Sequence, residues 1–195
     1  MAKSFRHNRW GNNKMREIEI KIKVENLEEI NQQLKEKGCE LSDPISQHDV
    51  IYSKGGSTEE WQSAKEGDII LRIRRMKDAA QFNLKQQRSG EMDNIEYETE
   101  IQDPEAMHKI LLLLGYRPEV EVKKMRRKGK LGEYEICLDE VEKLGSYIEV
   151  EKLTSDDANP QKVREELFRV IESLGLSRKD EETKGYDTQI YFLSH

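Results

Sequence analysis

Residues 17–24 read Glu-Ile-Glu-Ile-Lys-Ile-Lys-Val, a strict alternation of charged and aliphatic residues. Successive side chains of a β-strand point to opposite faces, so this segment is predicted to be a strand with one aliphatic and one charged face. The aliphatic face carries Ile18, Ile20, Ile22 and Val24, and the charged face carries Glu17, Glu19, Lys21 and Lys23. Because a strand that shows its charges to water alternates in the same way, the rest of the chain must decide what the charged face meets.

The length and composition indicate one globular domain. The chain has 195 residues and no linker-like stretch, so we expect a single domain over residues 15–195, preceded by a flexible arm over residues 1–14. Charged residues make up 37% of the chain, against roughly a quarter in an average protein. This surplus of charge lies either on the surface or along a polar interior.

Charge and cysteine usage exclude several functional classes. The net charge of −6 argues against a nucleic-acid binder and against an anionic-membrane binder, because both need a positive field. Cys39 and Cys137 are isolated in the sequence, which indicates neither a zinc site nor a disulfide framework and fits a cytoplasmic location. The chain has no apolar run of membrane-spanning length, and residues 1–14 lack the apolar segment of a signal peptide.

Three predicted helices each follow an alternating segment and end at a glycine. They cover residues 26–38, 103–115 and 159–175, and Asp103 and Asn159 stand at the expected N-cap positions of the second and third. Further alternating segments cover residues 68–76, 81–88, 95–102, 119–127, 132–141 and 144–153. Together these segments predict about eight strands and three helices in an α+β fold with an antiparallel sheet.

The sign of the charges follows the order of the strands. Carboxylates dominate the first and last strands, and basic residues dominate the middle ones. The helices each carry one apolar stripe and need an apolar sheet face to cover, which the isoleucines supply. We therefore predict a closed antiparallel β-barrel of about eight strands, with helices packed outside and the charged side chains lining a tunnel.

The charges of the predicted tunnel indicate which ligands it would bind. Two like charges about 4 Å apart repel by about 4 kcal/mol at an effective dielectric constant near 20, so the carboxylates require a neutralising partner. Hard oxygen ligands suit magnesium and manganese, and arginine forks match phosphate oxygens. A metal ion and basic residues around one polyphosphate are the usual apparatus of phosphoryl transfer.

The motifs, taken in order, resemble the CYTH superfamily, which is named for class IV adenylyl cyclases and thiamine triphosphatases and is also called the triphosphate tunnel metalloenzymes. They are ExExK (Glu17, Glu19, Lys21), LRIRR (Arg72, Arg74), LK (Lys85), ETE (Glu98, Glu100), KKMR (Lys124, Arg126), CLDEVEKLGSYIEVE (Asp139, Glu149, Glu151) and a tail with Tyr186. The resemblance covers residues 15–193 and implies an antiparallel barrel with a charged tunnel.

The resemblance also implies roles for individual residues. The implied ligands of Mg²⁺ or Mn²⁺ are Glu17, Glu19, Glu98, Asp139, Glu149 and Glu151. Which of Glu96, Glu98 and Glu100 faces the tunnel stays open. The implied triphosphate ligands are Lys21, Arg72, Arg74, Lys85, Lys124 and Arg126, and the implied catalytic residues are Glu17, Glu19, Lys85 and Asp139.

The resemblance allows two reactions in the same tunnel. A class IV cyclase would convert ATP to cyclic AMP and pyrophosphate, and an inorganic, nucleoside or thiamine triphosphatase would use water to attack the terminal phosphate. Thiamine triphosphatases carry Asp-x-Tyr after the first helix, whereas here Ile51 stands two residues after Asp49 and the tyrosine, Tyr52, stands three after. This departure favours the cyclase branch, with the triphosphatases as the alternative.

The sequence is also compatible with two kinds of protein that catalyse no reaction. A non-catalytic polyphosphate-binding module would use the tunnel for binding alone, and a sandwich with solvated charges would show no metal dependence. The expected small-molecule partner is ATP, tripolyphosphate or thiamine triphosphate, and a homodimer is a possible assembly. His48 and Asp49 are predicted to be surface structure in a loop, and His48 is given no catalytic role.

Overall fold

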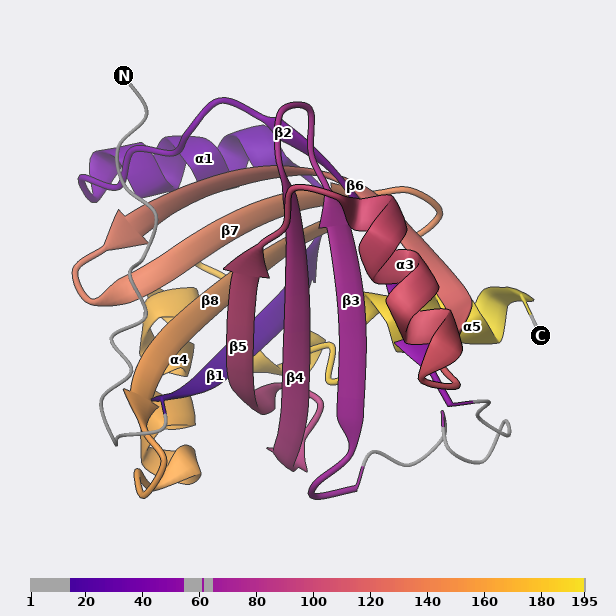
Figure 1. Cartoon of the computed structure of the whole chain (residues 1–195). Coiled ribbons are helices and arrows are strands. Elements are labelled where there is room, and N and C mark those ends of the chain that lie inside the picture. The colour runs from indigo at the N-terminus through magenta and orange to yellow at the C-terminus, as the bar shows by residue number, and fades with distance from the viewer. Residues whose placement is uncertain (1–14, 55–60, 62–64, 195) are drawn as a thin grey trace.

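The computed structural model describes residues 15–54, 61 and 65–194, so the predicted arm over residues 1–14 lies outside the described part (Figure 1). Its strands are β1 (Met15–Val24), β2 (Ile45–Ser53), β3 (Ile69–Arg75), β4 (Ala80–Gly90), β5 (Asp93–Glu100), β6 (Arg117–Leu131), β7 (Tyr134–Val141) and β8 (Gly145–Ser155). Its helices are α1 (Leu27–Glu36), α3 (Pro104–Leu113), α4 (Pro160–Ser173) and α5 (Tyr186–Ser194), with a short 3-10 helix at Arg178–Asp180.

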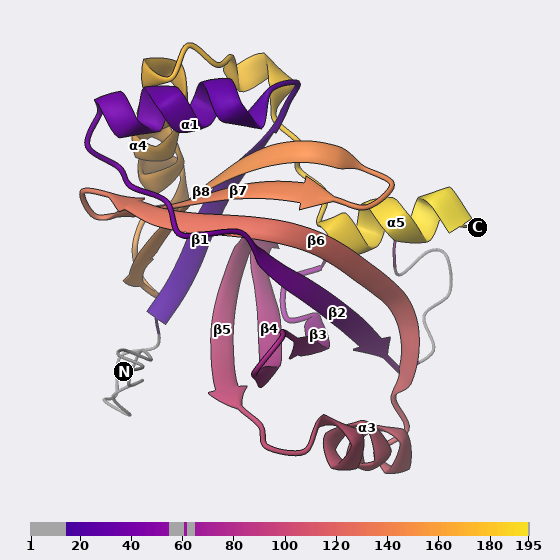
Figure 2. The ribbon, with the colours of Figure 1, turned by 90° about the horizontal axis from the view of Figure 1, so that it is seen from above.

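The eight strands form one antiparallel sheet that closes on itself in the order β1-β5-β4-β3-β2-β6-β7-β8. The ring closes at β1, which pairs with β8 from Met15 to Val24 and with β5 from Arg16 to Ile18. The predicted α+β fold with a closed antiparallel sheet is confirmed, and its charged faces line the interior. Figure 2 shows α1 and α4 outside the part of the ring that contains β1, β7 and β8.

The alternation in the first strand decides how the helices pack. Ile18, Ile20 and Ile22 have no exposed surface and lie in one core with Leu34 of α1 and Leu167 of α4. Their neighbours on β1 point the other way, into the ring. The aliphatic face therefore lies under the helices, as predicted.

The ends of the predicted helices are also confirmed. The side chains of Asp103 and Asn159 accept hydrogen bonds from backbone N–H groups in the first turns of α3 and α4. Gly115, just after α3, has a φ of 87°, which is a left-handed conformation that side chains other than glycine rarely adopt. The start of α3, its end and the start of α4 thus each have a local reason that can be read in the sequence.

The sequence does not predict the helix α5. The apolar residues of the tail do not make the long stripe that indicates a helix, so only its tyrosine stands out. In the structure Tyr186, Ile190 and Tyr191 are buried against Val120 and Val122 of β6. No helix among the described residues is both long enough and apolar enough to cross a membrane.

The core between β1 and the helices offers a test of the fold. Ile20 is fully buried, so Ile20→Ala leaves a cavity and is expected to lower the free energy of unfolding by about 2–5 kcal/mol. Leu113 of α3 is 89% exposed, and Leu113→Ala is the control, with an expected change within about 0.5 kcal/mol. Urea denaturation measures both values. Equal effects of the two changes would contradict this packing.

Candidate active site

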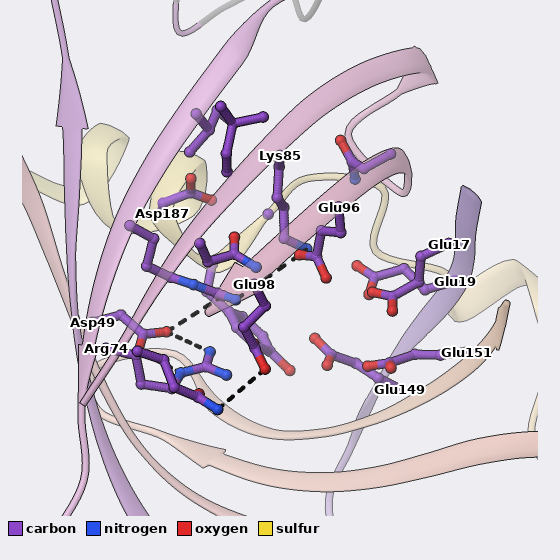
Figure 3. Close-up of a pocket in the computed structure, with 18 of the residues that line it drawn as sticks. Glu17, Glu19, Asp49, Arg74, Lys85, Glu96, Glu98, Glu149, Glu151 and Asp187 are labelled. Carbon is purple, nitrogen blue, oxygen red and sulfur yellow. Dashed lines mark hydrogen bonds and ion pairs between the residues drawn. The ribbon is translucent and has the colours of Figure 1, made fainter. Parts of the chain in front are cut away.

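The inward faces of the strands surround a cavity of about 1200 Å³ (Figure 3). Carboxylates enter it from β1, β5 and β8, and basic side chains enter it from β3, β4 and β6. The strict alternation of each strand places these groups inside, because the opposite face is held under the helices. The cavity is therefore the charged tunnel that the sequence predicts.

Three carboxylates from neighbouring strands form the acidic side of the tunnel. Glu17, Glu19 and Glu151 each offer an oxygen atom, and these oxygens lie within 4.8 Å of one another. Glu19 and Glu151 are directly opposite each other in the pairing of β1 with β8, a position in which like charges destabilise a sheet. Figure 3 shows this group facing Lys85 across the cavity.

The pKa values of these carboxyl groups reflect their crowding. Burial raises the pKa of Glu151 to about 8, and the negative charges of Glu19 and Glu149 add to the shift while Arg126 opposes it. Burial and the charges of Glu96 and Glu151 likewise raise the pKa of Glu17 well above its ordinary value. The cluster therefore favours bound protons or a bound cation over three free negative charges.

The acidic cluster fits a divalent cation of the hard type. Its donors are carboxylate oxygens, which are the ligands that Mg²⁺ and Mn²⁺ prefer. The repulsion that raises the pKa of Glu151 is the repulsion that a cation would relieve. Glu17, Glu19 and Glu151, three of the six carboxylates proposed from the sequence, are thus residues that could hold such a metal ion.

The other three proposed metal ligands are not part of this cluster. Asp139 is fully buried, and its carboxylate accepts hydrogen bonds from Arg126 (Nε, 2.7 Å) and Lys124 (Nζ, 3.2 Å). Glu149 lines the cavity, and its carboxylate also binds Arg126. Glu98 lines an exposed part of the cavity. None of these three carboxylates belongs to the compact cluster of Glu17, Glu19 and Glu151, although Glu149 lies beside it.

The strand register places Glu96 deepest of the three glutamates of β5 that the sequence could not separate. Glu96 pairs in register with Lys85 of β4, and the Lys85 Nζ lies 2.8 Å from its carboxylate. Although burial opposes the shift, Lys85 and Arg72 lower the pKa of Glu96 to about 2. Glu98 and Glu100 point to the same face but are exposed.

Most of the proposed phosphate ligands are bound to carboxylates within the tunnel. Arg74 donates from Nε and Nη2 to Asp49 at 2.7 Å each, a two-pronged ion pair. Lys85 is bound to Glu96, and Lys124 and Arg126 are bound to Asp139. The proposed basic ligands therefore all line one cavity, and the paired ones would meet an anion in competition with carboxylates of the chain itself.

Arg72 is the least engaged arginine of the tunnel. Its guanidinium nitrogens are 3.6 Å from Asp49 and 3.9 Å from Glu96, which is too far for good hydrogen bonds. Its Nε is buried and has no hydrogen-bond partner among the described residues. A buried donor without a partner is costly, so Arg72 is prepared to bind an anion.

Asp49 is a tunnel residue that the sequence analysis placed wrongly. The loop predicted for His48 and Asp49 is part of strand β2, and Asp49 is only 2% exposed. Although burial opposes the shift, Arg74 and Arg72 hold the pKa of Asp49 well below its usual range. His48 points to the outside, where its Nε2 lies 2.9 Å from Glu121. The alternation of Gln47, Asp49 and Ile51 was the signal that could have found it.

The tyrosine of the same strand lies outside the tunnel. Tyr52 is buried under α3, and its hydroxyl forms a hydrogen bond of 2.8 Å with Nδ1 of His108. Ile51 occupies the inward position and lines the cavity. The one-residue displacement seen in the sequence thus turns this tyrosine to the opposite face of the strand.

A second group with metal-ligand spacing shares one member with the first. Glu135, Cys137 and Glu151 offer ligand atoms within 4.8 Å of one another, a grouping that the isolated cysteines of the sequence did not indicate. Lys128 forms an ion pair with Glu135, and burial raises the pKa of the Cys137 thiol well above its ordinary value. Cys137 is therefore a neutral thiol beside the carboxylates.

Comparison with known proteins identifies the family. A profile of the CYTH domain matches residues 15–186. The chain belongs to the CYTH family. This family contains proteins that act on small-molecule triphosphates such as ATP, which agrees with the charged tunnel.

Three proteins similar to this CYTH protein include one curated sequence and two solved structures. A protein of Methanocaldococcus jannaschii, named as a candidate adenylate cyclase, is 30% identical over 177 residues, which cover 88% of this chain and 97% of that protein. A solved structure from Pyrococcus horikoshii is 27% identical with a TM-score of 0.74, covering 89% of this chain and 98% of that one. A candidate adenylyl cyclase from Hippeastrum, described as having a dominant triphosphatase activity, is 18% identical with a TM-score of 0.58. The match covers 92% of this chain and 95% of that one.

The raised pKa of Glu151 predicts how stability depends on pH without metal. The pKa is about 8 in the folded protein against 4.5 for an ordinary glutamate, so the stabilisation from the protonated group is complete below pH 4.5 and is lost as the pH rises through 8. In a chelating buffer the free energy of unfolding is expected to fall between about pH 5 and pH 8. Glu151→Gln should flatten this fall.

The free energy of unfolding is measured by urea denaturation at each pH for the wild type, for Glu151→Gln and for the exposed control Glu133→Gln. Three other buried carboxylates, Glu96, Asp49 and Asp139, have lowered pKa values. The stability that they contribute is lost only as the pH falls below about 4, the ordinary pKa of a carboxyl group in the unfolded chain. It therefore does not change between about pH 5 and pH 8. A wild-type stability that rises steadily over the same window would contradict the proposed crowding.

Proposed function

We propose that this CYTH protein is a metal-dependent enzyme that acts on a triphosphate compound inside its tunnel. One observation carries the proposal: an acidic cluster whose repulsion the basic residues of the chain relieve only in part faces a set of basic side chains across one cavity. A cation on the first and a polyanion on the second would together neutralise both. A neutral or monoanionic ligand would leave the repulsion in place.

The acidic side would bind the cation through Glu17, Glu19 and Glu151. A bound Mg²⁺ or Mn²⁺ would supply Lewis-acid polarisation of phosphate oxygens. Glu149 lies beside this group and holds Arg126, so it would orient a phosphate ligand rather than only a cation. The proposed metal role of Asp139 is the least supported of the set, because both of its oxygens are occupied by Lys124 and Arg126.

The basic side would bind the triphosphate through residues that converge from four strands, β1, β3, β4 and β6. Arg72 would make the first contact, because its donors are the least engaged. Lys85 lies between Glu96 and the acidic cluster, so it can meet a phosphate oxygen that also faces that cluster. Asp49 would hold the Arg74 guanidinium in place, and Arg74 can bind phosphate only with the donors that Asp49 leaves free.

For the reaction, we take an adenylyl cyclase activity, from ATP to cyclic AMP and pyrophosphate, as the first candidate. The Methanocaldococcus jannaschii relative supports this choice, because it matches along nearly its whole length and is named as a candidate adenylate cyclase. In this reaction the tunnel residues would hold the triphosphate so that the ribose 3′-oxygen lies in line with the α-phosphorus, about 3–3.5 Å away.

Hydrolysis of the triphosphate by water is the second candidate. The Hippeastrum protein favours it, because a protein of this fold that was expected to be a cyclase is described as having a dominant triphosphatase activity. Both reactions need the same grip on the three phosphates. They differ in whether the sugar is held, and water needs no such hold.

Binding of the triphosphate is expected to require both sides of the tunnel. Calorimetry with tripolyphosphate should show binding with magnesium and much weaker binding in a chelating buffer. Arg72→Ala removes a charge-assisted contact worth about 1.5–3 kcal/mol and should weaken binding roughly tenfold or more. Arg75→Ala is the matched control, because Arg75 is on the same strand but pairs with Glu105 of α3. Equal binding with and without metal would remove the proposed metal role.

Product analysis decides between the two reactions. Incubation of the protein with ATP and manganese, followed by chromatography, should yield cyclic AMP and pyrophosphate for a cyclase, or ADP and orthophosphate for a triphosphatase. Glu19→Gln should abolish whichever activity is found, because a ligand and its charge are lost together. Glu25→Gln, an exposed change just beyond the same strand, should leave the activity unchanged. No turnover of ATP or tripolyphosphate by the wild type would leave only a binding function.

A further inference from the structure

The chain beyond α4 returns to the ring and contributes to the wall of the tunnel. The backbone N–H of Glu182 donates to the carbonyl of Lys21 at 2.8 Å, and Glu181 bridges Ile22 in an antiparallel manner. The Glu91 carboxylate accepts hydrogen bonds from the Gly185 N–H at 2.6 Å and from the Thr188 hydroxyl at 2.9 Å. These contacts fasten the start of α5 to β1 and to the turn before β5.

This attachment places the ring of Tyr186 between two proposed phosphate ligands. The side chain lines the cavity and the residue is 7% exposed. The ammonium nitrogens of Lys21 and Lys124 lie 4.3 Å and 4.8 Å from the centre of its ring. Tyr147 packs edge-on against the same ring, with centroids 5.2 Å apart. Both lysine distances are within the range of a cation–π interaction.

An aromatic ring is an unusual partner for a cation in this tunnel. Lys85, Arg74, Lys124 and Arg126 are each bound to a carboxylate, which a phosphate would have to displace. Among the described residues, no carboxylate lies within ion-pair distance of the Lys21 ammonium, which donates instead to the carbonyl oxygen of Lys184. The face of an aromatic ring attracts a cation without carrying a net charge, so it orients the ammonium without competing for it as an anion would.

We propose that Tyr186 is a positioning residue for the triphosphate, whose ring holds the Lys21 ammonium toward the cavity and, together with the carboxylate of Asp139, also holds the Lys124 ammonium. This inference rests on the proposed function, since it assigns the two lysines to phosphate binding. It makes the C-terminal segment part of the binding site. The ring carries the role. The hydroxyl stays a neutral phenol, because burial and the charges of Glu149 and Asp139 raise the pKa of Tyr186 well above 10.

The test compares Tyr186→Phe, which keeps the ring, with Tyr186→Leu, which removes it. Calorimetry with tripolyphosphate and magnesium should show affinity within about twofold of the wild type for the phenylalanine variant and about fivefold to tenfold weaker for the leucine variant. Tyr191→Leu is the matched control, since it removes another buried tyrosine of α5 that does not lie over these lysines. Binding of Mn²⁺ alone should be the same in all four proteins, because the acidic cluster is unchanged.

A double-mutant cycle shows whether the ring acts through Lys21. Once Lys21→Ala has removed one ammonium, Tyr186→Leu should cost less affinity than it does in the wild type. Titrations run below the melting temperature of every variant separate this effect from unfolding. Wild-type affinity in Tyr186→Leu, an equal loss in Tyr186→Phe, or full additivity with Lys21→Ala would each overturn the proposal. A wild type that binds no tripolyphosphate would instead reject the proposed function, and the positioning role with it.

Discussion

The burial of charge inside a closed ring is the constraint on which the rest of this structure depends. Going round the ring, carboxylates enter from β8, carboxylates and Lys21 from β1, carboxylates from β5, cations from β4 and β3, a carboxylate from β2, cations from β6 and carboxylates from β7. Opposite charges on neighbouring strands compensate each other over most of this circuit. Such pairs offset the cost of taking each charge out of water, and leaving one member unpaired is far more costly than losing both.

Compensation is weakest at the junction of β1 and β8. There Glu19 and Glu151 stand opposite each other, and burial with the charges of neighbouring carboxylates raises the pKa values of both. A chain selected for stability alone would place a basic residue at one of these positions. The junction of β1 and β8 is therefore the part of the ring whose charges require a ligand from outside the chain. Ion pairs such as Arg74 with Asp49 instead hold the side chains around it in place.

Helix packing and tunnel chemistry are two consequences of the same strands. The aliphatic face of β1 forms the core with α1 and α4, so a shift of one residue in its register would expose the isoleucines and bury the charges in that core. The stability of the outer core thus fixes the direction of every inward side chain. The C-terminal helix α5 likewise has two roles, because it packs on β6 and also brings Tyr186 to Lys21 and Lys124.

The sequence by itself determined the faces of most strands, the ends of three helices and most of the charges in the tunnel, because these depend on the two-residue pleat, on capping and on composition. Only the tertiary structure decided that Glu96 lies deeper than Glu98, that Asp49 holds Arg74, and that Tyr186 lies over two lysines. These facts depend on register and on ring closure, which bring together residues far apart in the chain. Local periodicity carries no information about which residues of distant strands become neighbours.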